Sequence, residues 1–90
     1  MLKHLKIRGR VQGVGYRYFT LQNARELGVN GWVKNRLDGS VEVLLSGSQN
    51  SVNELIRRLH QGPFSARVDD IMEMDTEPNP DMLSDFQIKR

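Results

Sequence analysis

The stretch NRLDGSVEVLL, residues 35–45, decides the fold. Its Asp38-Gly39 pair lies between two extended runs, which is a strong short-range signal of a β-hairpin. The run before the pair, GWVKN at residues 31–35, and the run after it, VEVLLSG at residues 41–47, are therefore predicted to be neighbouring antiparallel strands. The remaining elements must be arranged around these two strands.

Apolar side chains spaced by three or four positions predict a helix on each side of the hairpin. In the first helix these positions are Tyr16, Ala24 and Leu27, with the small Thr20 on the same face. In the second helix they are Val52, Leu55, Ile56 and Leu59. Gly28 is suited to end the first helix in a left-handed conformation. Ser48 or Ser51 can cap the second helix, and the Gly-Pro pair at residues 62–63 ends its pattern.

Further strands are predicted at the two ends of the chain. Residues 2–11, LKHLKIRGRV, alternate apolar or small residues with charged ones, as a half-buried strand does. A fourth strand with less regular alternation is predicted at residues 66–75, ARVDDIMEMD. The stretch at residues 76–83 carries two prolines and is predicted to be a loop, and residues 85–90, DFQIKR, a short final strand.

The order β-α-β-β-α-β, with a short strand added at the end, predicts an α+β sandwich of ferredoxin-like type. Two helices of similar length cannot cover both faces of four main antiparallel strands, so both are expected on one face. Ninety residues allow one core, and a single domain over residues 1–90 is expected. The glycine-rich turn after the first strand then lies at one end of the sheet.

Composition limits the classes of partner. Thirteen Lys and Arg against eleven Asp and Glu give a net charge of only +2, with the charges interspersed, so nucleic-acid binding is not expected. The absence of cysteine excludes disulfides, thiolate metal sites and cysteine nucleophiles. The first ten residues form no apolar signal core, and no window approaches the ~20 apolar residues of a membrane span. A cytoplasmic monomer that binds no membrane is expected.

The segment GRVQGVGYR, residues 9–17, combines glycines with an arginine at the start of the first helix. The first N–H groups of a helix have no carbonyl partner and favour an anion, and Gly13 and Gly15 leave the backbone free to converge around it. Arg17 is a cation beside the positive end of the helix dipole. This placement is favourable only when an anion such as phosphate lies between them.

Three common phosphate sites do not match this segment. A Walker loop needs Gly-Lys-Ser/Thr after its second glycine, and no lysine precedes Arg17 here. The dinucleotide fingerprint needs a third glycine where Tyr18 stands. A cysteine phosphatase needs its nucleophile where Val11 stands. Water must then attack the phosphoryl group directly.

The run GRVQGVGYR, followed by GWVKNRLDGSVEV, resembles the acylphosphatase family. The similarity continues through Gly47-Ser48, SARVDDI at residues 65–71 and FQIKR at residues 86–90, so it extends over nearly the whole chain. The resemblance implies a ferredoxin-like fold. It also implies hydrolysis of acyl phosphates to a carboxylate and inorganic phosphate, without a metal or cofactor.

The resemblance also implies which residues carry the reaction. Arg17 matches the phosphate-binding arginine of the family, and Asn35 matches the asparagine that positions the attacking water. Residues 12–17, called here the cradle segment, supply the backbone amides around the phosphate. The expected substrate-binding residues are Gln12, Gly13, Val14, Gly15, Tyr16 and Arg17.

General chemistry agrees with this assignment. The leaving carboxylate needs no strong general acid, and phosphoryl transfer depends mainly on positioning and charge stabilisation. Asn35 is neutral and cannot act as a base, but its amide can hold a water. The proton is expected to leave by way of the substrate's own phosphate oxygens. His4 and His60 fit no metal-binding spacing and are interpreted as surface or helix-end residues.

Alternative interpretations remain at this stage. The glycines could merely shape a sharp turn, Asn35 could merely lead into the hairpin, and Tyr16 and Trp32 are interpreted as packing aromatics. An RNA-binding module is disfavoured because the strand at residues 41–47 carries no aromatic residue. A phosphate-binding domain without useful catalysis is the stronger alternative, because fold and loop alone do not establish turnover. The presence of Asn35 favours the enzyme.

Overall fold

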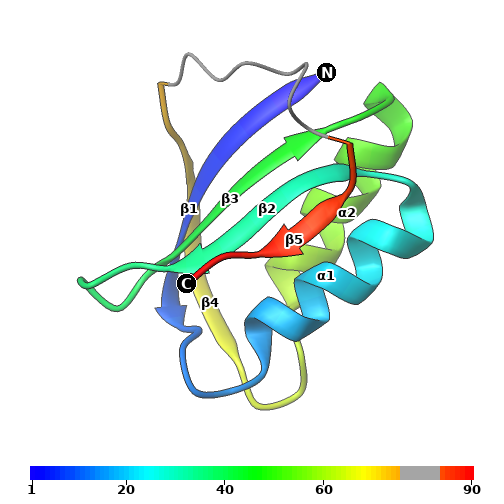
Figure 1. The fold of residues 1–90 in the computed structure, drawn as a ribbon. Coiled ribbons are helices and arrows are strands. Elements are labelled where there is room, and N and C mark those ends of the chain that lie inside the picture. Colours follow the sequence, from blue (N-terminus) through cyan, green and yellow to red (C-terminus); the bar gives the residue numbers. More distant parts are fainter. Residues whose placement is uncertain (76–83) are drawn as a thin grey trace.

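The computed structural model describes residues 1–75 and 84–90 and contains the predicted elements in the predicted order (Figure 1). They are β1 (Leu2–Arg10), α1 (Tyr16–Leu27), β2 (Asn30–Asn35), β3 (Val41–Ser46), α2 (Gln49–Gln61), β4 (Arg67–Glu73) and β5 (Phe86–Ile88). The loop predicted at residues 76–83 lies outside the described residues.

The sheet has the strand order β4-β1-β3-β2-β5. β3 pairs antiparallel with β1 and with β2, and β1 pairs antiparallel with β4. The predicted hairpin and the ferredoxin-like class are therefore confirmed, with both helices on one face (Figure 1). The short final strand β5 extends the sheet beyond β2, and it runs parallel to β2.

The strand register directs the apolar side chains toward the helices. Leu5 pairs with Val43 and Ile7 with Val41, so these alternate residues share the buried face. Val52, Leu55 and Leu59 of α2 close over them and are fully buried. A shift of one residue in this register would expose the whole apolar set.

The ends of both helices follow the sequence signals. Gly28 adopts φ 71° and ψ 29° after α1, and its N–H donates to the carbonyl of Arg25 at 3.3 Å. Ser48 caps α2 by accepting a hydrogen bond from the Ser51 N–H at 3.2 Å. Within the described parts of the chain, neither helix is long and apolar enough to cross a membrane.

Both aromatic residues interpreted as packing residues do pack against the protein. Tyr16 is buried, its hydroxyl donates to the Leu59 carbonyl at 2.7 Å, and burial raises the pKa of this phenol. Trp32 is half-buried on the face of the sheet without helices. The ammonium groups of Lys34 and Lys89 lie 5.3 and 4.6 Å from its ring centroid.

The interpretation of His4 as a surface residue is wrong, whereas His60 is exposed near the end of α2 as expected. The His4 side chain is only 11% exposed. Its Nε2 lies at hydrogen-bond distance from Glu42, and its ring meets the Trp32 ring edge-on at 5.8 Å. The alternation of residues 2–11 could not reveal this, because Glu42 and Trp32 come from other strands.

On the exposed side of α2, Glu54 accepts hydrogen bonds from two arginines. Arg57 Nη2 lies 2.6 Å from its carboxylate and Arg58 Nε lies 3.0 Å from it. These two hydrogen bonds lower the pKa of Glu54 from 4.5 to about 2, and the bond from Arg57 has the larger effect.

Glu54→Gln is expected to flatten the acid dependence of stability between pH 4.5 and about 2. Because the folded-state pKa is lowered, the ionised carboxylate stabilises the fold above the unfolded-state pKa, and this contribution is lost as the pH falls through the folded-state value. Urea unfolding across this range measures the effect. It should shrink in about 1 M salt, which screens exposed charges. Parallel pH profiles for the two proteins would contradict the assignment.

Candidate active site

Strand directions bring the two candidate segments to one end of the sheet. β1 and β2 both run antiparallel to β3, so they run parallel to each other and end at the same edge. Ile7 and Asn35 both pair with Val41, from opposite sides. Asn35 therefore shares the helix-covered face with Ile7, and the chain leaving β1 enters α1 on that face.

The glycines of the cradle segment are required by backbone conformation. Gly13 has φ 74°, and Gly15, the N-cap of α1, has φ 80° and ψ 18°. A Cβ at either position would meet no atom within 4 Å, so steric space is not the reason for glycine. Positive φ values on both sides of Val14 are the kind of backbone conformation from which anion-binding nests are made.

These N–H groups are free of protein partners. Among the hydrogen bonds of the described residues, none has an N–H of residues 12–18 as its donor. The Phe19 N–H is the first to donate, to the Gly15 carbonyl at 3.0 Å. The first turn of α1 contains no acidic residue and its N-cap makes no side-chain hydrogen bond. The positive end of the helix is thus not neutralised by the protein.

Arg17 lies in this first turn and is half-buried. Its guanidinium forms no ion pair or hydrogen bond with any residue in the described parts of the chain. Together with Tyr18, Ile88 and Arg90 it lines an open pocket of about 600 Å³. An unpaired guanidinium beside unpaired amides is suited to an anion with several oxygens.

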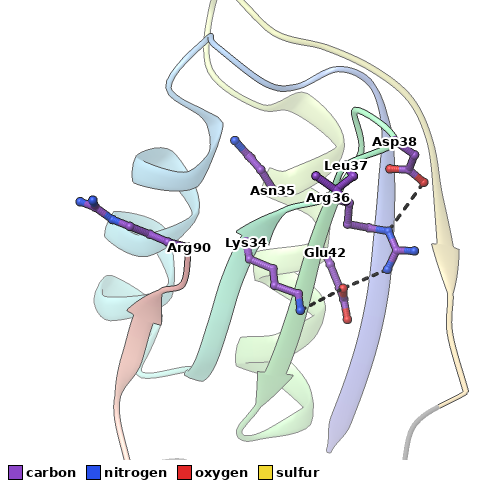
Figure 2. A pocket seen from close by; sticks show the side chains of 7 residues that line it. All are labelled: Lys34, Asn35, Arg36, Leu37, Asp38, Glu42 and Arg90. Carbon is purple, nitrogen blue, oxygen red and sulfur yellow. Dashed lines mark hydrogen bonds and ion pairs between the residues drawn. The ribbon is translucent and has the colours of Figure 1, made fainter.

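Asn35 lines a second pocket of about 420 Å³ (Figure 2). Figure 2 shows its side chain directed away from Glu42, whereas Lys34 and Arg36 reach toward that carboxylate. Asn35 Oδ1 is buried and accepts no hydrogen bond from the described residues. Arg90 lines both pockets, so the pocket lined by Arg17 is next to the pocket lined by Asn35.

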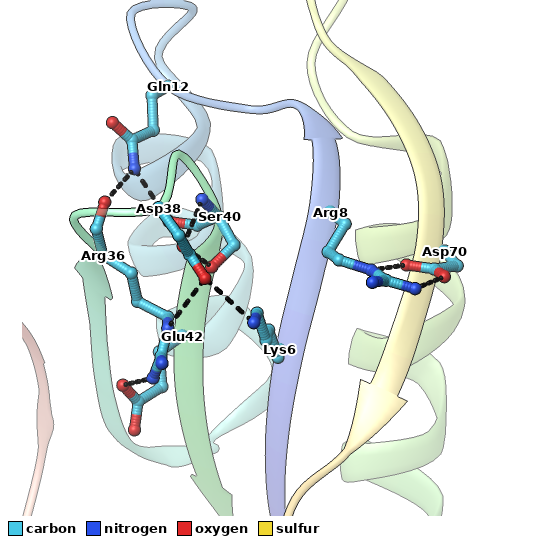
Figure 3. Close-up of polar contacts among 8 residues, drawn as sticks. All are labelled: Lys6, Arg8, Gln12, Arg36, Asp38, Ser40, Glu42 and Asp70. Carbon is cyan, nitrogen blue, oxygen red and sulfur yellow. Dashed lines mark hydrogen bonds and ion pairs between the residues drawn. The ribbon is translucent and has the colours of Figure 1, made fainter.

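The side chains of three predicted cradle residues are already engaged by the protein. Val14 packs against the core and Tyr16 is part of it. The Gln12 carboxamide donates to the carbonyls of Arg36 and Ser40, at 2.7 and 2.8 Å (Figure 3). The hydrogen-bond donors that these residues can offer to an anion are therefore their backbone N–H groups. No local pattern in the sequence identified the bonds of Gln12, because its acceptors lie more than twenty residues away.

The carboxylates near these pockets are held in ionised form. The pKa of Asp38 lies well below its usual range, mainly because the Ser40 hydroxyl donates to it and also because Lys6 pairs with it at 2.9 Å. Burial alone would raise the pKa of Glu42, but His4 and the neighbouring cations lower it overall. Lys34 and Arg36 pair with Glu42 at 3.8 and 3.0 Å. Neither carboxylate is poised to donate a proton near neutral pH.

No group of three or more metal-ligating side chains is found among residues 1–75 and 84–90. The chain folds as a ferredoxin-like α+β protein. The free amides beside Arg17 make the start of its first helix suited to bind an anion.

Comparison with known proteins defines the family. A family model described as Acylphosphatase matches residues 3–88. An acylphosphatase from Nitrobacter winogradskyi is 52% identical over 79 residues, which cover 88% of this chain and 80% of that protein. The chain belongs to the acylphosphatase family, and membership implies a hydrolase that acts on acyl phosphates.

Solved structures agree with this assignment. The crystal structure of acylphosphatase from Bacillus subtilis is similar with a TM-score of 0.90 and 35% identity, and it covers 100% of both chains. An acylphosphatase from Coxiella burnetii has a TM-score of 0.83 and 34% identity, with 98% of this chain and 90% of that chain covered.

Gly15→Ala is expected to destabilise the protein by ~1–2 kcal/mol, the cost of a Cβ in the left-handed region, and to weaken binding of inorganic phosphate as the turn relaxes. Gly28→Ala is the matched control, because Gly28 has φ 71° and similarly open surroundings at the other end of α1. The Gly28→Ala variant should lower the free energy of unfolding by a similar amount and leave phosphate binding unchanged. Urea unfolding and calorimetric titration with phosphate measure the two effects. Equal phosphate affinities in the two variants would contradict a role for the turn.

Proposed function

We propose that this protein is a metal-independent acylphosphatase, built as a single domain over residues 1–90, in which water attacks the phosphoryl group directly. The observation that carries the proposal is that two segments end at the same edge of the sheet: the unpaired amides with Arg17, and the half-buried Asn35. Family membership supports the reaction class.

In this proposal the cradle segment binds the phosphoryl group. The backbone N–H groups of residues 12–17 donate to its oxygens, and the Arg17 guanidinium donates to two of them in a bidentate pair. A charged hydrogen bond contributes roughly 1.5–3 kcal/mol, which exceeds the ~0.3–1 kcal/mol penalty of a cation at a helix start. Bound phosphate thus accounts for the position of Arg17.

Asn35 positions the attacking water. Its carboxamide lines the second pocket, and its Oδ1 accepts no hydrogen bond from the described residues, so the amide group is available to hydrogen-bond the water and fix the direction of attack. The bond from water oxygen to phosphorus forms as the bond from phosphorus to the acyl oxygen breaks. The water proton passes to a phosphate oxygen, and the products are a carboxylate and inorganic phosphate. A carboxylate is a weak base, so its departure needs no proton donor.

The proposal extends to partners and location. The substrate is a small-molecule acyl phosphate and the product inorganic phosphate. We propose a cytoplasmic monomer that needs no cofactor and binds neither nucleic acid nor membrane. The small, interspersed net charge of +2 supports the absence of a nucleic-acid partner.

Purified protein is expected to hydrolyse benzoyl phosphate in the presence of a chelator at the same rate as without it, and to leave an ordinary phosphate monoester uncleaved. The reason for this selectivity is that benzoyl phosphate releases a carboxylate, which is a better leaving group than the alcohol of a phosphate monoester. Release of inorganic phosphate from the two compounds, measured side by side, provides the test. Phosphate binding without turnover would favour the non-catalytic alternative.

Arg17→Ala is expected to abolish both phosphate binding and turnover, because it removes the cation that faces the cradle amides. Asn35→Ala should leave phosphate binding intact while it lowers kcat by roughly 10²–10³-fold, the range for loss of a preorganised polar group. Steady-state kinetics with inorganic phosphate as inhibitor separates the two effects. Full activity in both variants would refute the site.

A further inference from the structure

One side chain connects the two halves of the proposed site. Gln12 Nε2 donates to the carbonyl of Arg36 at 2.7 Å and to that of Ser40 at 2.8 Å (Figure 3). Gln12 begins the cradle segment, and Arg36 directly follows Asn35. Among the described residues, these are the hydrogen bonds that join the cradle segment to the hairpin loop, residues 36–40.

The two acceptors also close the hairpin loop. The Arg36 N–H donates to the Ser40 carbonyl at 2.8 Å, and the Gly39 N–H donates to the Arg36 carbonyl at 3.2 Å. Gln12 therefore contacts the loop at its closing hydrogen bonds, next to the end of β2. Both protons of one amide group are used, and a carboxylate or thioether of similar length has no such donors.

We propose that Gln12 is a positioning residue that holds the Asn35 carboxamide at the correct distance from the phosphate cradle. The inference rests on the proposed function and deepens it. Its side chain does not bind the phosphoryl group, since Nε2 donates to the hairpin loop and an amide oxygen cannot donate to phosphate oxygens. It acts through the hairpin loop on the water that Asn35 holds.

If Gln12 has this role, phosphate affinity and the rate of the chemical step depend on different contacts. Phosphate binding depends on the amides and guanidinium of one continuous segment, residues 12–17. The attack on phosphorus depends in addition on the distance between that segment and Asn35. A misplacement of about 1 Å between reacting groups can cost roughly 10²-fold in rate, so loss of the connection should lower kcat and spare phosphate affinity.

The hairpin loop has other attachments that should keep it folded without Gln12. Lys6 of β1 pairs with Asp38 at 2.9 Å, and Arg36 pairs with Glu42 at 3.0 Å. The Ser40 N–H also donates to Asp38, at 3.0 Å. The two ion pairs hold the loop to the sheet, whereas among the described residues Gln12 alone bonds it to the cradle segment.

Gln12→Met keeps the length of the side chain and removes both donors. With benzoyl phosphate we expect kcat to fall about 10- to 100-fold, while the inhibition constant of inorganic phosphate stays within about threefold of the wild type. Gln61→Met, on the exposed end of α2, is the matched control and should leave both values unchanged.

A double-mutant cycle tests whether Gln12 acts through Asn35. In an Asn35→Ala background, Gln12→Met should change kcat by less than about twofold, because the group it positions is already gone. A residue that merely supports the fold would lower kcat by the same factor in both backgrounds. That additive result would overturn the inference.

Gln12→Glu supplies a second, independent test that also serves if Gln12→Met fails to fold. An ionised carboxylate facing the two carbonyls cannot donate a hydrogen bond, whereas a protonated carboxyl group can. The two carbonyl oxygens disfavour the negative charge, so they raise the pKa of the introduced carboxyl group. The kcat deficit relative to the wild type should therefore narrow from about pH 8 to about pH 5. A deficit that is constant with pH, or an equal loss of phosphate affinity, would overturn the inference. An inactive wild-type protein would instead refute the proposed function itself.

Discussion

The common direction of β1 and β2 on either side of β3 is the constraint on which the proposed site depends. Both strands pair antiparallel with the same central neighbour, so both end at one edge of the sheet. The pairing of Ile7 and Asn35 with the same residue, Val41, then sets Asn35 on the helix-covered face. Two segments about twenty residues apart in sequence meet without any direct covalent or metal link.

In the proposed site, main-chain groups supply most of the hydrogen-bond donors, and side chains hold the main chain in place. Val14 and Tyr16 are anchored in the apolar interior, and Gln12 is bonded to the hairpin loop. Amides fixed in this way need little reorganisation when charge develops on a bound group, which is the condition for effective electrostatic stabilisation. Only Arg17 and Asn35 are proposed to contribute side-chain atoms to the reaction.

Most of the fold was predictable because its signals are local. Asp38-Gly39 predicted the hairpin, Gly28 predicted the end of α1, and the apolar spacing of α2 predicted its buried face. The residues of the proposed site came from a family pattern, and their roles stay predictions. What local patterns could not reveal are contacts between distant segments: the bonds of Gln12, the burial of His4 against Glu42, and the parallel pairing of β5 with β2. Such contacts depend on how whole strands are arranged.

The placement of β5 has a consequence for how the molecule behaves among copies of itself. Without these three residues the backbone groups along one side of β2 would be open to a strand from another chain, a recognised route to aggregation. The opposite edge, β4, carries Arg67, Asp69 and Asp70, charged side chains of the kind that discourage such pairing. The sheet thus ends in a very short strand on one side and in a charged strand on the other, and the proposed site lies at the ends of the strands between them.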